Sequence, residues 1–140
     1  MEPVLVSACL LGVNCKYSGG NNLCPELEQL KERYRLIPVC PEQLGGLSTP
    51  RPPSECREDK VINKEGLDVT EQFQKGAEEA LKIGQYFGCK KAILKSRSPS
   101  CGSEGIYDGS FSGKVVPGEG VTAKLLRRSG FSLFSEENIL

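Results

Sequence analysis

The sequence predicts a single-domain α/β fold: an open, mainly parallel, Rossmann-like sheet with flanking helices. Short apolar runs alternate along the chain with segments whose apolar residues recur at helical spacing, which is the pattern of such folds. The runs are continuously apolar, as in parallel strands that are buried on both faces. The length of 140 residues fits one domain over 1–140, because a chain of this size can bury about two-thirds of its unfolded surface.

Four apolar runs are predicted to be the strands of this sheet. They cover residues 3–8, 36–39, 91–95 and 131–134. Pro38 removes one backbone donor from the second of these strands. A separate small hairpin is predicted from residues 60–63 and 67–69, which flank a turn containing Gly66. The connections between the parallel strands are expected to be right-handed crossovers.

Three helices are predicted between the strands. A short helix opens at Pro25 and presents on one face Leu27, Leu30 and Tyr34. The longest begins at Asp68, which together with Glu71 fits a helix cap, and Gly88 is suited to end it in a left-handed conformation. The third begins near Val121 and stops before Gly130.

Composition excludes several classes of partner. Lys plus Arg and Asp plus Glu number 18 each, so no net charge points to a nucleic acid polymer or an anionic membrane. No apolar run is long enough to cross a bilayer and no secretory segment is recognised, so we expect a cytoplasmic protein. There is no histidine, which removes the usual general base and the commonest zinc ligand. The cysteines number seven, and in this setting they are expected to be reduced thiols rather than a disulfide framework.

Three of the cysteines follow predicted strands. Cys9 follows the first strand and Cys40 the second, and Cys101 lies in the polar loop 95–102 that follows the third. In open α/β sheets, ligands bind beyond the carboxyl ends of the strands, at the point where the strand order reverses. We therefore expect these three thiols to converge in one crevice.

The spacing of the cysteines leaves their chemistry open. No Cys-x-x-Cys pair is present, which argues against a zinc ribbon or a thioredoxin-like redox site. An iron–sulfur cluster needs only thiolates, and distant loops can supply them. Buried, inert thiols are the ordinary alternative, and we favour that interpretation for Cys56 and Cys89.

Several motifs occur in an order that resembles a known family. They are Val6–Gly12, Cys15–Tyr17, Val39–Glu42, Gly45–Leu47, Pro50–Pro53, Ser98–Gly102, Tyr107–Gly109 and Gly118–Ala123. By these motifs the chain is similar to the bacterial 2-thiouracil desulfurase family, long catalogued as a domain of unknown function. The resemblance covers nearly all of the chain, and its cysteine-bearing motifs are specific in combination.

The resemblance implies a cofactor, a ligand set and a reaction. The implied cofactor is a [4Fe-4S] cluster held by Cys9, Cys40 and Cys101, with the fourth iron open. Cys15, in the first loop, is the residue that would displace one of these ligands. The implied reaction removes sulfur from a thiolated pyrimidine such as 2-thiouracil and yields uracil and sulfide. The implied partner is therefore a small thiolated heterocycle.

Because there is no histidine, another group has to transfer protons. Glu42 lies two residues after Cys40, close enough to share the crevice, and the family pattern also suggests it; an ordinary solvated glutamate is the alternative. The family pattern suggests the Ser98 hydroxyl for orienting the substrate or relaying protons, although serine in Ser-Pro-Ser more often forms a turn. Three cations could supply positive charge to the site, namely Arg51, Lys95 and Arg97. For such residues a position on the surface is the commoner outcome.

Two other functions stay open at this point. A non-catalytic or electron-transfer iron–sulfur module would need the cluster but not Glu42. A thiol-based enzyme or a zinc protein would contain no cluster. A cluster with an open iron is expected to be oxygen-sensitive, so the metal content of protein purified without oxygen separates these possibilities.

Gly118-Glu119-Gly120 is interpreted as a packing turn, because it lacks the full phosphate-loop or dinucleotide pattern.

Overall fold

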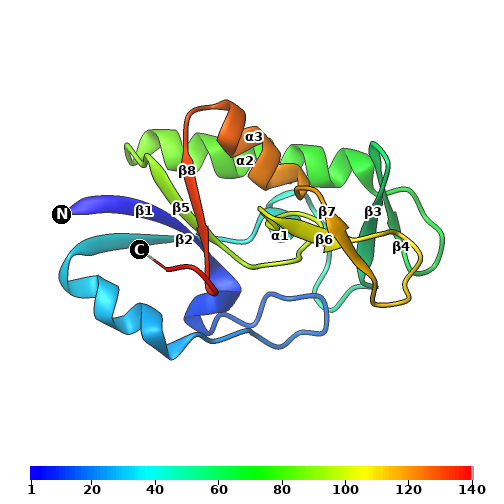
Figure 1. Cartoon of the computed structure of the whole chain (residues 1–140), viewed down its shortest axis with the longest axis horizontal. Coiled ribbons are helices and arrows are strands. Elements are labelled where there is room, and N and C mark those ends of the chain that lie inside the picture. The colour runs from blue at the N-terminus through cyan, green and yellow to red at the C-terminus, as the bar shows by residue number, and fades with distance from the viewer. Residues whose placement is uncertain (140) are drawn as a thin grey trace.

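Four parallel strands form the central sheet of the computed structural model, which describes residues 1–139 (Figure 1). They are β1 (Glu2–Ser7), β2 (Tyr34–Val39), β5 (Lys91–Leu94) and β8 (Ser132–Ser135), in the order β2-β1-β5-β8. Every pairing in this sheet is parallel, so the predicted α/β class is confirmed. The middle strands are the most deeply buried, and Val4, Leu5 and Val6 of β1 are fully inaccessible to solvent.

The strand order brings three strand ends together. The chain goes from β1 to β2 on one side, then crosses back to place β5 on the other side of β1. The order therefore reverses at β1 and β5, the position at which open α/β sheets bind ligands. Pro38 pairs with Val6 from β2, which lies at the edge of the sheet. An edge strand tolerates the missing backbone donor of a proline.

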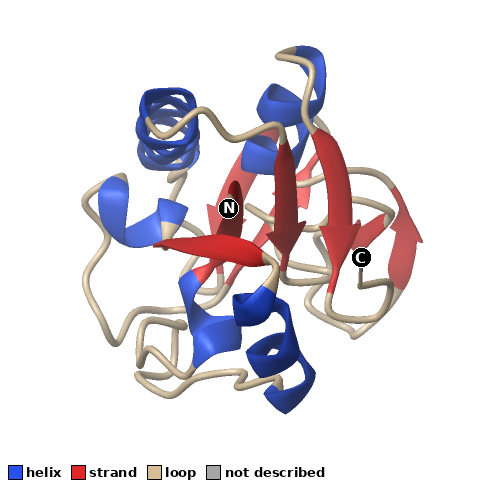
Figure 2. Ribbon diagram, turned by 90° about the vertical axis from the view of Figure 1, so that its left-hand side faces the viewer, coloured by secondary structure: helices blue, strands red, loops and turns tan. Residues whose placement is uncertain are grey.

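Helices cover both faces of the sheet (Figure 2). One face packs α2 (Thr70–Tyr86) and α3 (Val121–Arg128) against Leu5, Ala92 and Leu94. The opposite face packs the 3₁₀ helices η1 (Ala8–Leu11) and η2 (Pro25–Glu32) against Val4, Val6 and Ile93. Successive residues of β1 thus enter different cores, as the two-residue period of a strand requires. A single helical turn, α1 (Pro41–Leu44), follows β2 after one residue, Cys40.

The helix predictions need two corrections. The long helix begins at Thr70 rather than Asp68, because the Asp68 carboxylate accepts hydrogen bonds from the Thr70 backbone N–H (2.9 Å) and hydroxyl (2.6 Å) and forms a turn before the helix. Its end agrees with the prediction, since Gly88 has a positive φ of 73°. The short helix at Pro25 is a 3₁₀ helix that ends at Glu32, and Tyr34 belongs to β2.

The hairpin prediction is confirmed in its pairing but was incomplete. Residues 60–63 do pair with 67–69: the Asn63 N–H donates to the Leu67 carbonyl and the Val69 N–H to the Val61 carbonyl, each at 2.9 Å, on either side of an antiparallel bridge between Ile62 and Asp68. The prediction missed the strand on the other side, since β4 (Lys60–Asn63) also pairs antiparallel with β3 (Ser54–Arg57). A second hairpin was missed. It joins β6 (Gly105–Tyr107) to β7 (Val115–Pro117) through the loop 108–114. Both hairpins are short and lie apart from the central sheet, so their apolar patterns are weak.

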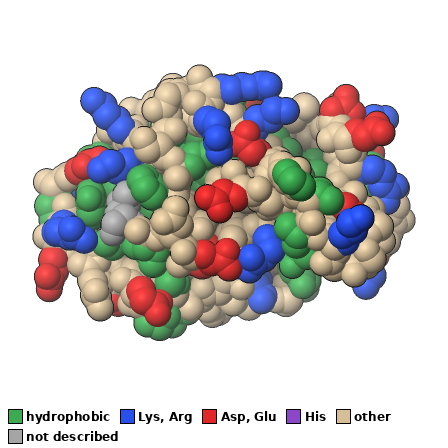
Figure 3. All heavy atoms as spheres, in the orientation of Figure 1, with side chains coloured by type: hydrophobic (Ala, Val, Ile, Leu, Met, Phe, Trp, Pro, Cys, Tyr) green, Lys and Arg blue, Asp and Glu red, His purple; other side chains and the backbone are tan. Residues whose placement is uncertain are grey.

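The surface agrees with the balanced composition. On the face drawn in Figure 3, basic and acidic side chains are interspersed. No helix within residues 1–139 combines the length and the apolar character that a membrane span requires.

Candidate active site

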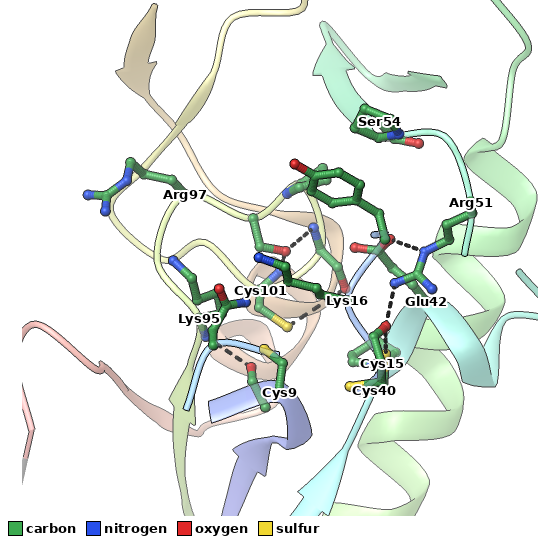
Figure 4. Close-up of a pocket in the computed structure, with 18 of the residues that line it drawn as sticks. Cys9, Cys15, Lys16, Cys40, Glu42, Arg51, Ser54, Lys95, Arg97 and Cys101 are labelled. Atoms are coloured by element: carbon green, nitrogen blue, oxygen red, sulfur yellow. Dashed lines mark hydrogen bonds and ion pairs between the residues drawn. The ribbon is translucent and has the colours of Figure 1, made fainter. Parts of the chain in front are cut away.

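A pocket of about 490 Å³ opens beyond the carboxyl ends of β1, β2 and β5. Four cysteine side chains line it: Cys9, Cys15, Cys40 and Cys101. Figure 4 shows Cys9 beside Cys101 and Cys15 beside Cys40. The predicted convergence of the three strand-end thiols is therefore confirmed, and Cys15 shares the same pocket. Whether each thiol binds a metal stays a prediction.

The ends of the strands position these thiols. Cys9 lies in η1, which begins immediately after β1, and Cys40 is the residue between β2 and Pro41 at the start of α1. The Ser7 hydroxyl accepts a hydrogen bond from the Lys95 backbone N–H at 2.9 Å, which joins the ends of β1 and β5. The loop carrying Cys101 therefore starts at a fixed position next to the loop carrying Cys9.

The Cys101 loop is held from within by Ser98. The Ser98 hydroxyl oxygen accepts hydrogen bonds from the backbone N–H groups of Ser100 (3.1 Å) and Cys101 (2.9 Å). The Ser98 carbonyl accepts a third, from Gly102 N–H at 2.9 Å. Ser98 is thus a turn former, as its Ser-Pro-Ser setting suggested, and it also lines the pocket. Because two N–H groups occupy the acceptor sites of its hydroxyl, the hydroxyl proton remains for donation.

The start of α3 forms backbone hydrogen bonds with the same loop. Backbone N–H groups of Gly120, Val121 and Thr122 donate to the carbonyls of Gly102 (2.7 Å), Pro99 (2.9 Å) and Ser100 (2.8 Å), respectively. These N–H groups have no partner inside the helix, so the loop satisfies them. The hydroxyls of Ser100 and Thr122 add a contact of 2.8 Å. The glycines before α3 therefore act as a packing turn, in agreement with the sequence interpretation.

Glu42 and Arg51 form a buried ion pair in the pocket wall. The Arg51 Nε donates to Glu42 Oε1 at 2.9 Å, and the side chains are only 5% and 17% exposed, respectively. The general expectation that Arg51 is a surface cation is therefore wrong. The sequence analysis did not predict that Arg51 is buried and pairs with Glu42. The one sequence feature that could have indicated a role in the site is that Arg51 lies inside the Pro50–Pro53 motif shared with the family. Burial raises the pKa of Glu42 above its ordinary value, although the adjacent guanidinium acts in the opposite direction.

Burial makes three of the thiols in the pocket weaker acids than a free cysteine. Burial raises the pKa of Cys9, and it is the main reason why the pKa values of Cys15 and Cys101 rise to about 12. Thiolates become stable there when a metal supplies positive charge. A set of soft sulfur donors in one pocket fits an iron–sulfur group better than a metal that prefers oxygen ligands. Within residues 1–139, no three Cys, Asp or Glu side chains are grouped closely enough to hold a single metal ion.

The other two predicted cations also line the pocket, and each is paired with a carboxylate. Lys95 pairs with Glu136 at 2.9 Å, and Arg97 pairs with Glu137 at 3.1 Å. The Glu136 carboxylate also accepts hydrogen bonds from the backbone N–H and the hydroxyl of Ser96, each at 2.8 Å. The segment after β8 thus fixes the first residues of the Cys101 loop.

The remaining cysteines lie outside the pocket lining. Cys89 is buried in the core between the sheet and α2, which agrees with an inert role. Cys56 is half-buried on β3, and its thiol donates to the Pro99 carbonyl at 3.4 Å, so it supports the Cys101 loop from behind. The Cys24 thiol contacts Glu26 at 3.1 Å in a separate surface groove.

The second hairpin and a buried acid complete the pocket wall. The Glu55 carboxylate accepts hydrogen bonds from the backbone N–H groups of Gly109 (2.9 Å) and Phe111 (3.1 Å). This fixes the loop between β6 and β7. Phe111 of this loop and Tyr107 at the end of β6 line the pocket. Asp108 accepts from the Ser110 backbone N–H and so forms a turn. Glu55 was not singled out from the sequence, because its partners lie 54 and 56 residues away.

Three comparisons with known proteins agree with this geometry. A family model described as 2-thiouracil desulfurase matches residues 4–138. An uncharacterized protein from Bacillus subtilis (strain 168), YbbK, is 40% identical over 146 aligned positions that cover 97% of each chain. A solved structure described as the [4Fe-4S]-dependent thiouracil desulfidase TudS is 46% identical, with a TM-score of 0.92 over 98% of this chain and 92% of that chain. Because the family model spans nearly the whole sequence, the chain belongs to the 2-thiouracil desulfurase family.

Proposed function

We propose that this chain is a [4Fe-4S]-dependent desulfurase that converts a small thiolated pyrimidine, such as 2-thiouracil, to uracil and sulfide. The observation that carries the proposal is the meeting of Cys9, Cys40 and Cys101 in one pocket beside the carboxylate of Glu42. Family membership and the similarity to TudS support the same activity. Reduced thiols are typical of a cytoplasmic protein, which is the location we propose. We also propose that residues 1–140 form one domain.

The proposed ligands of the cluster are Cys9, Cys40 and Cys101. When bound through three thiolates, the cluster supplies an open iron as a Lewis acid for the departing sulfur. Cys15 lines the same pocket and is the alternative to Cys9. Spectroscopy and iron content of Cys9→Ala and Cys15→Ala after identical anaerobic reconstitution distinguish them. We expect Cys9→Ala to lose bound iron and Cys15→Ala to retain it, and the reverse result would exchange their roles.

The reaction is a hydrolysis and needs no electrons. The oxygen of water forms a bond to the carbon of the thiocarbonyl, the carbon–sulfur bond breaks, and the two protons of water end on sulfide. Glu42 is assigned to take a proton from the attacking water and to return it to the leaving group. The Ser98 hydroxyl is assigned to orient the heterocycle by donating a hydrogen bond, because its acceptor sites are occupied within the loop.

Anaerobic reconstitution followed by an assay of sulfide tests the proposal. We expect about four irons per chain, as this class of cluster requires, and release of sulfide and uracil from 2-thiouracil. Exposure to air should remove both the cluster absorbance and the activity. A fully loaded protein that releases no sulfide from any thiolated base would contradict the proposed activity while leaving the cluster assignment intact.

A further inference from the structure

Arg51 is a buried cation at the centre of a polar network. Its side chain is 5% exposed and lies in the segment between α1 and β3. The guanidinium donates to Glu42 Oε1 (2.9 Å), the Cys15 carbonyl (2.9 Å), the Ser48 carbonyl (3.2 Å) and the Thr49 hydroxyl (3.0 Å). One planar group therefore joins α1, the loop that carries Cys15 and the segment just before Arg51 itself, with a fixed fork of donors that the single ammonium of a lysine does not have.

The contact with Glu42 distinguishes the two oxygens of that carboxylate. Oε1 accepts the hydrogen bond from Arg51 Nε, whereas Oε2 accepts none from any residue between 1 and 139. Glu42 also lines the pocket, as Figure 4 shows. One oxygen is thus fixed by the protein, and the other remains available to a molecule in the pocket.

The anchor of Arg51 on the first loop fixes where this carboxylate can lie. The Arg51 backbone N–H donates to the Tyr17 carbonyl at 2.8 Å, in addition to the side-chain contact with the Cys15 carbonyl. Both acceptors belong to the loop between η1 and η2, which carries Cys15 into the pocket. Arg51 therefore holds Glu42 at a set distance from the thiol-bearing loop.

We propose that Arg51 is the positioning residue of Glu42: it binds Oε1 and presents Oε2 to the water and the sulfur of the substrate. This inference rests on the proposed desulfurase activity, in which Glu42 transfers protons. A displacement of a reacting group by about 1 Å can cost about 100-fold in rate. Loss of the Arg51 anchor is therefore expected to lower kcat, while KM and the iron content change little.

The test compares Arg51→Gln and Arg51→Lys in two backgrounds, wild type and Glu42→Gln. Each protein is reconstituted anaerobically, and kcat is expressed per bound cluster. In the wild-type background we expect kcat to fall at least about tenfold, with KM within about twofold. In the Glu42→Gln background the same substitutions should change kcat by less than about twofold, because residues that act as a unit are not additive. The double variant Glu42→Gln/Arg51→Gln also removes both charges, so neither is left buried and unpaired.

Arg127→Gln is the matched control. Arg127 forms an ion pair with Glu119 at 2.8 Å, and neither residue lines the pocket. We expect this variant to keep the kcat, KM and iron content of the wild type. A guanidinium salt added to iron-loaded Arg51→Gly is a second measurement, and it should restore part of kcat if the missing group only positions Glu42.

Three results would overturn the inference. Equal losses of kcat in both backgrounds would mean that Arg51 does not act through Glu42. Loss of iron in proportion to activity, with kcat per cluster unchanged, would mean that Arg51 only stabilises the loops that carry the thiols. Failure of guanidinium to raise kcat of folded, iron-loaded Arg51→Gly would exclude a positioning role. If the loaded wild-type protein releases no sulfide, the proposed function fails first and this inference fails with it.

Discussion

Gly120→Ala tests how the fold holds the Cys101 loop. Gly120 has φ −67° and ψ 164°, a conformation open to any residue, so alanine brings no backbone strain at this position. Its Cβ would, however, lie 2.5 Å from both the carbonyl carbon and the oxygen of Ser100, and 2.8 Å from the Pro99 oxygen. These are backbone atoms, which cannot rotate away as a side chain can. The start of α3 and the loop must therefore separate.

The size of the effect follows from the hydrogen bonds at this contact. The backbone N–H groups of Gly120, Val121 and Thr122 donate across it at 2.7, 2.9 and 2.8 Å. Loss of two or three such bonds, at about 1 kcal/mol each, would destabilise the protein by roughly 2–3 kcal/mol. Overpacking of a close contact costs a similar amount, typically about 1–3 kcal/mol. At about 3 °C for each kcal/mol, we expect Tm to fall by roughly 6–9 °C.

The assay is thermal unfolding of the anaerobic, iron-loaded protein, together with its iron content. Gly20→Ala is the control, since it is also a glycine substitution in a loop near the pocket. A Cβ at Gly20 would be 3.5 Å from Ser18 Oγ and 3.6 Å from Lys16 Cε, which are ordinary contacts, and Gly20 does not have a positive φ. We expect Gly120→Ala to lose iron faster than the control. A Tm within about 1 °C of the control, with equal iron retention, would refute the role of α3 as a clamp on the Cys101 loop.

Three further outcomes are expected. Cys89→Ala should bind as much iron as the wild type, because Cys89 lies in the core away from the pocket; iron loss on reconstitution would contradict this. Phe73→Ala should lower the free energy of unfolding in urea by about 3–5 kcal/mol, because Phe73 is 1% exposed; a loss below about 1 kcal/mol would contradict its core role. Burial alone raises the pKa of Glu136, but hydrogen bonds from Ser96 and Lys95 outweigh it and hold the pKa below its usual value of 4.5. Urea unfolding should therefore find the wild type more stable than Glu136→Gln above pH 4.5, with the difference disappearing as the pH falls through the folded-state pKa; a pH-independent difference would rule this out.

Local sequence patterns predicted the main elements of the fold. The continuous apolar runs of β1 and β5 are buried on both faces. In α2, the apolar residues Phe73, Ala77 and Ala80 recur at helical spacing and lie on its buried side. Gly88 ends α2 as expected, because a left-handed residue is needed there. These features depend on residues close together in the chain. The pairing of 60–63 with 67–69 was predicted, but the pairings of β3 with β4 and of β6 with β7 were missed, since the partners of short strands are set by packing rather than by periodicity.

The candidate site was predicted only in part. The positions of Cys9, Cys40 and Cys101 after strands indicated a shared crevice, because parallel strands end at the same edge of a sheet. The burial of Arg51 and its pairing with Glu42 were not predicted, since Arg-Pro-Pro reads locally as an exposed, irregular segment. The assignment of the thiols as ligands stays a prediction. So do the roles of Glu42 in proton transfer and of Ser98 in orienting the substrate or relaying protons.

The sequence by itself determined the class of fold, the reduced thiols at the ends of strands, and a chemistry without histidine. Only the tertiary structure decided that Cys15 joins the pocket, that α3 clamps the Cys101 loop, and that Arg51 occupies one oxygen of Glu42. The physical reason is the range of the interactions. Burial patterns and backbone preferences depend on residues that are close together in the chain. A hydrogen bond such as that between Arg51 and Cys15 joins groups 36 residues apart, and it forms only once the layers have packed.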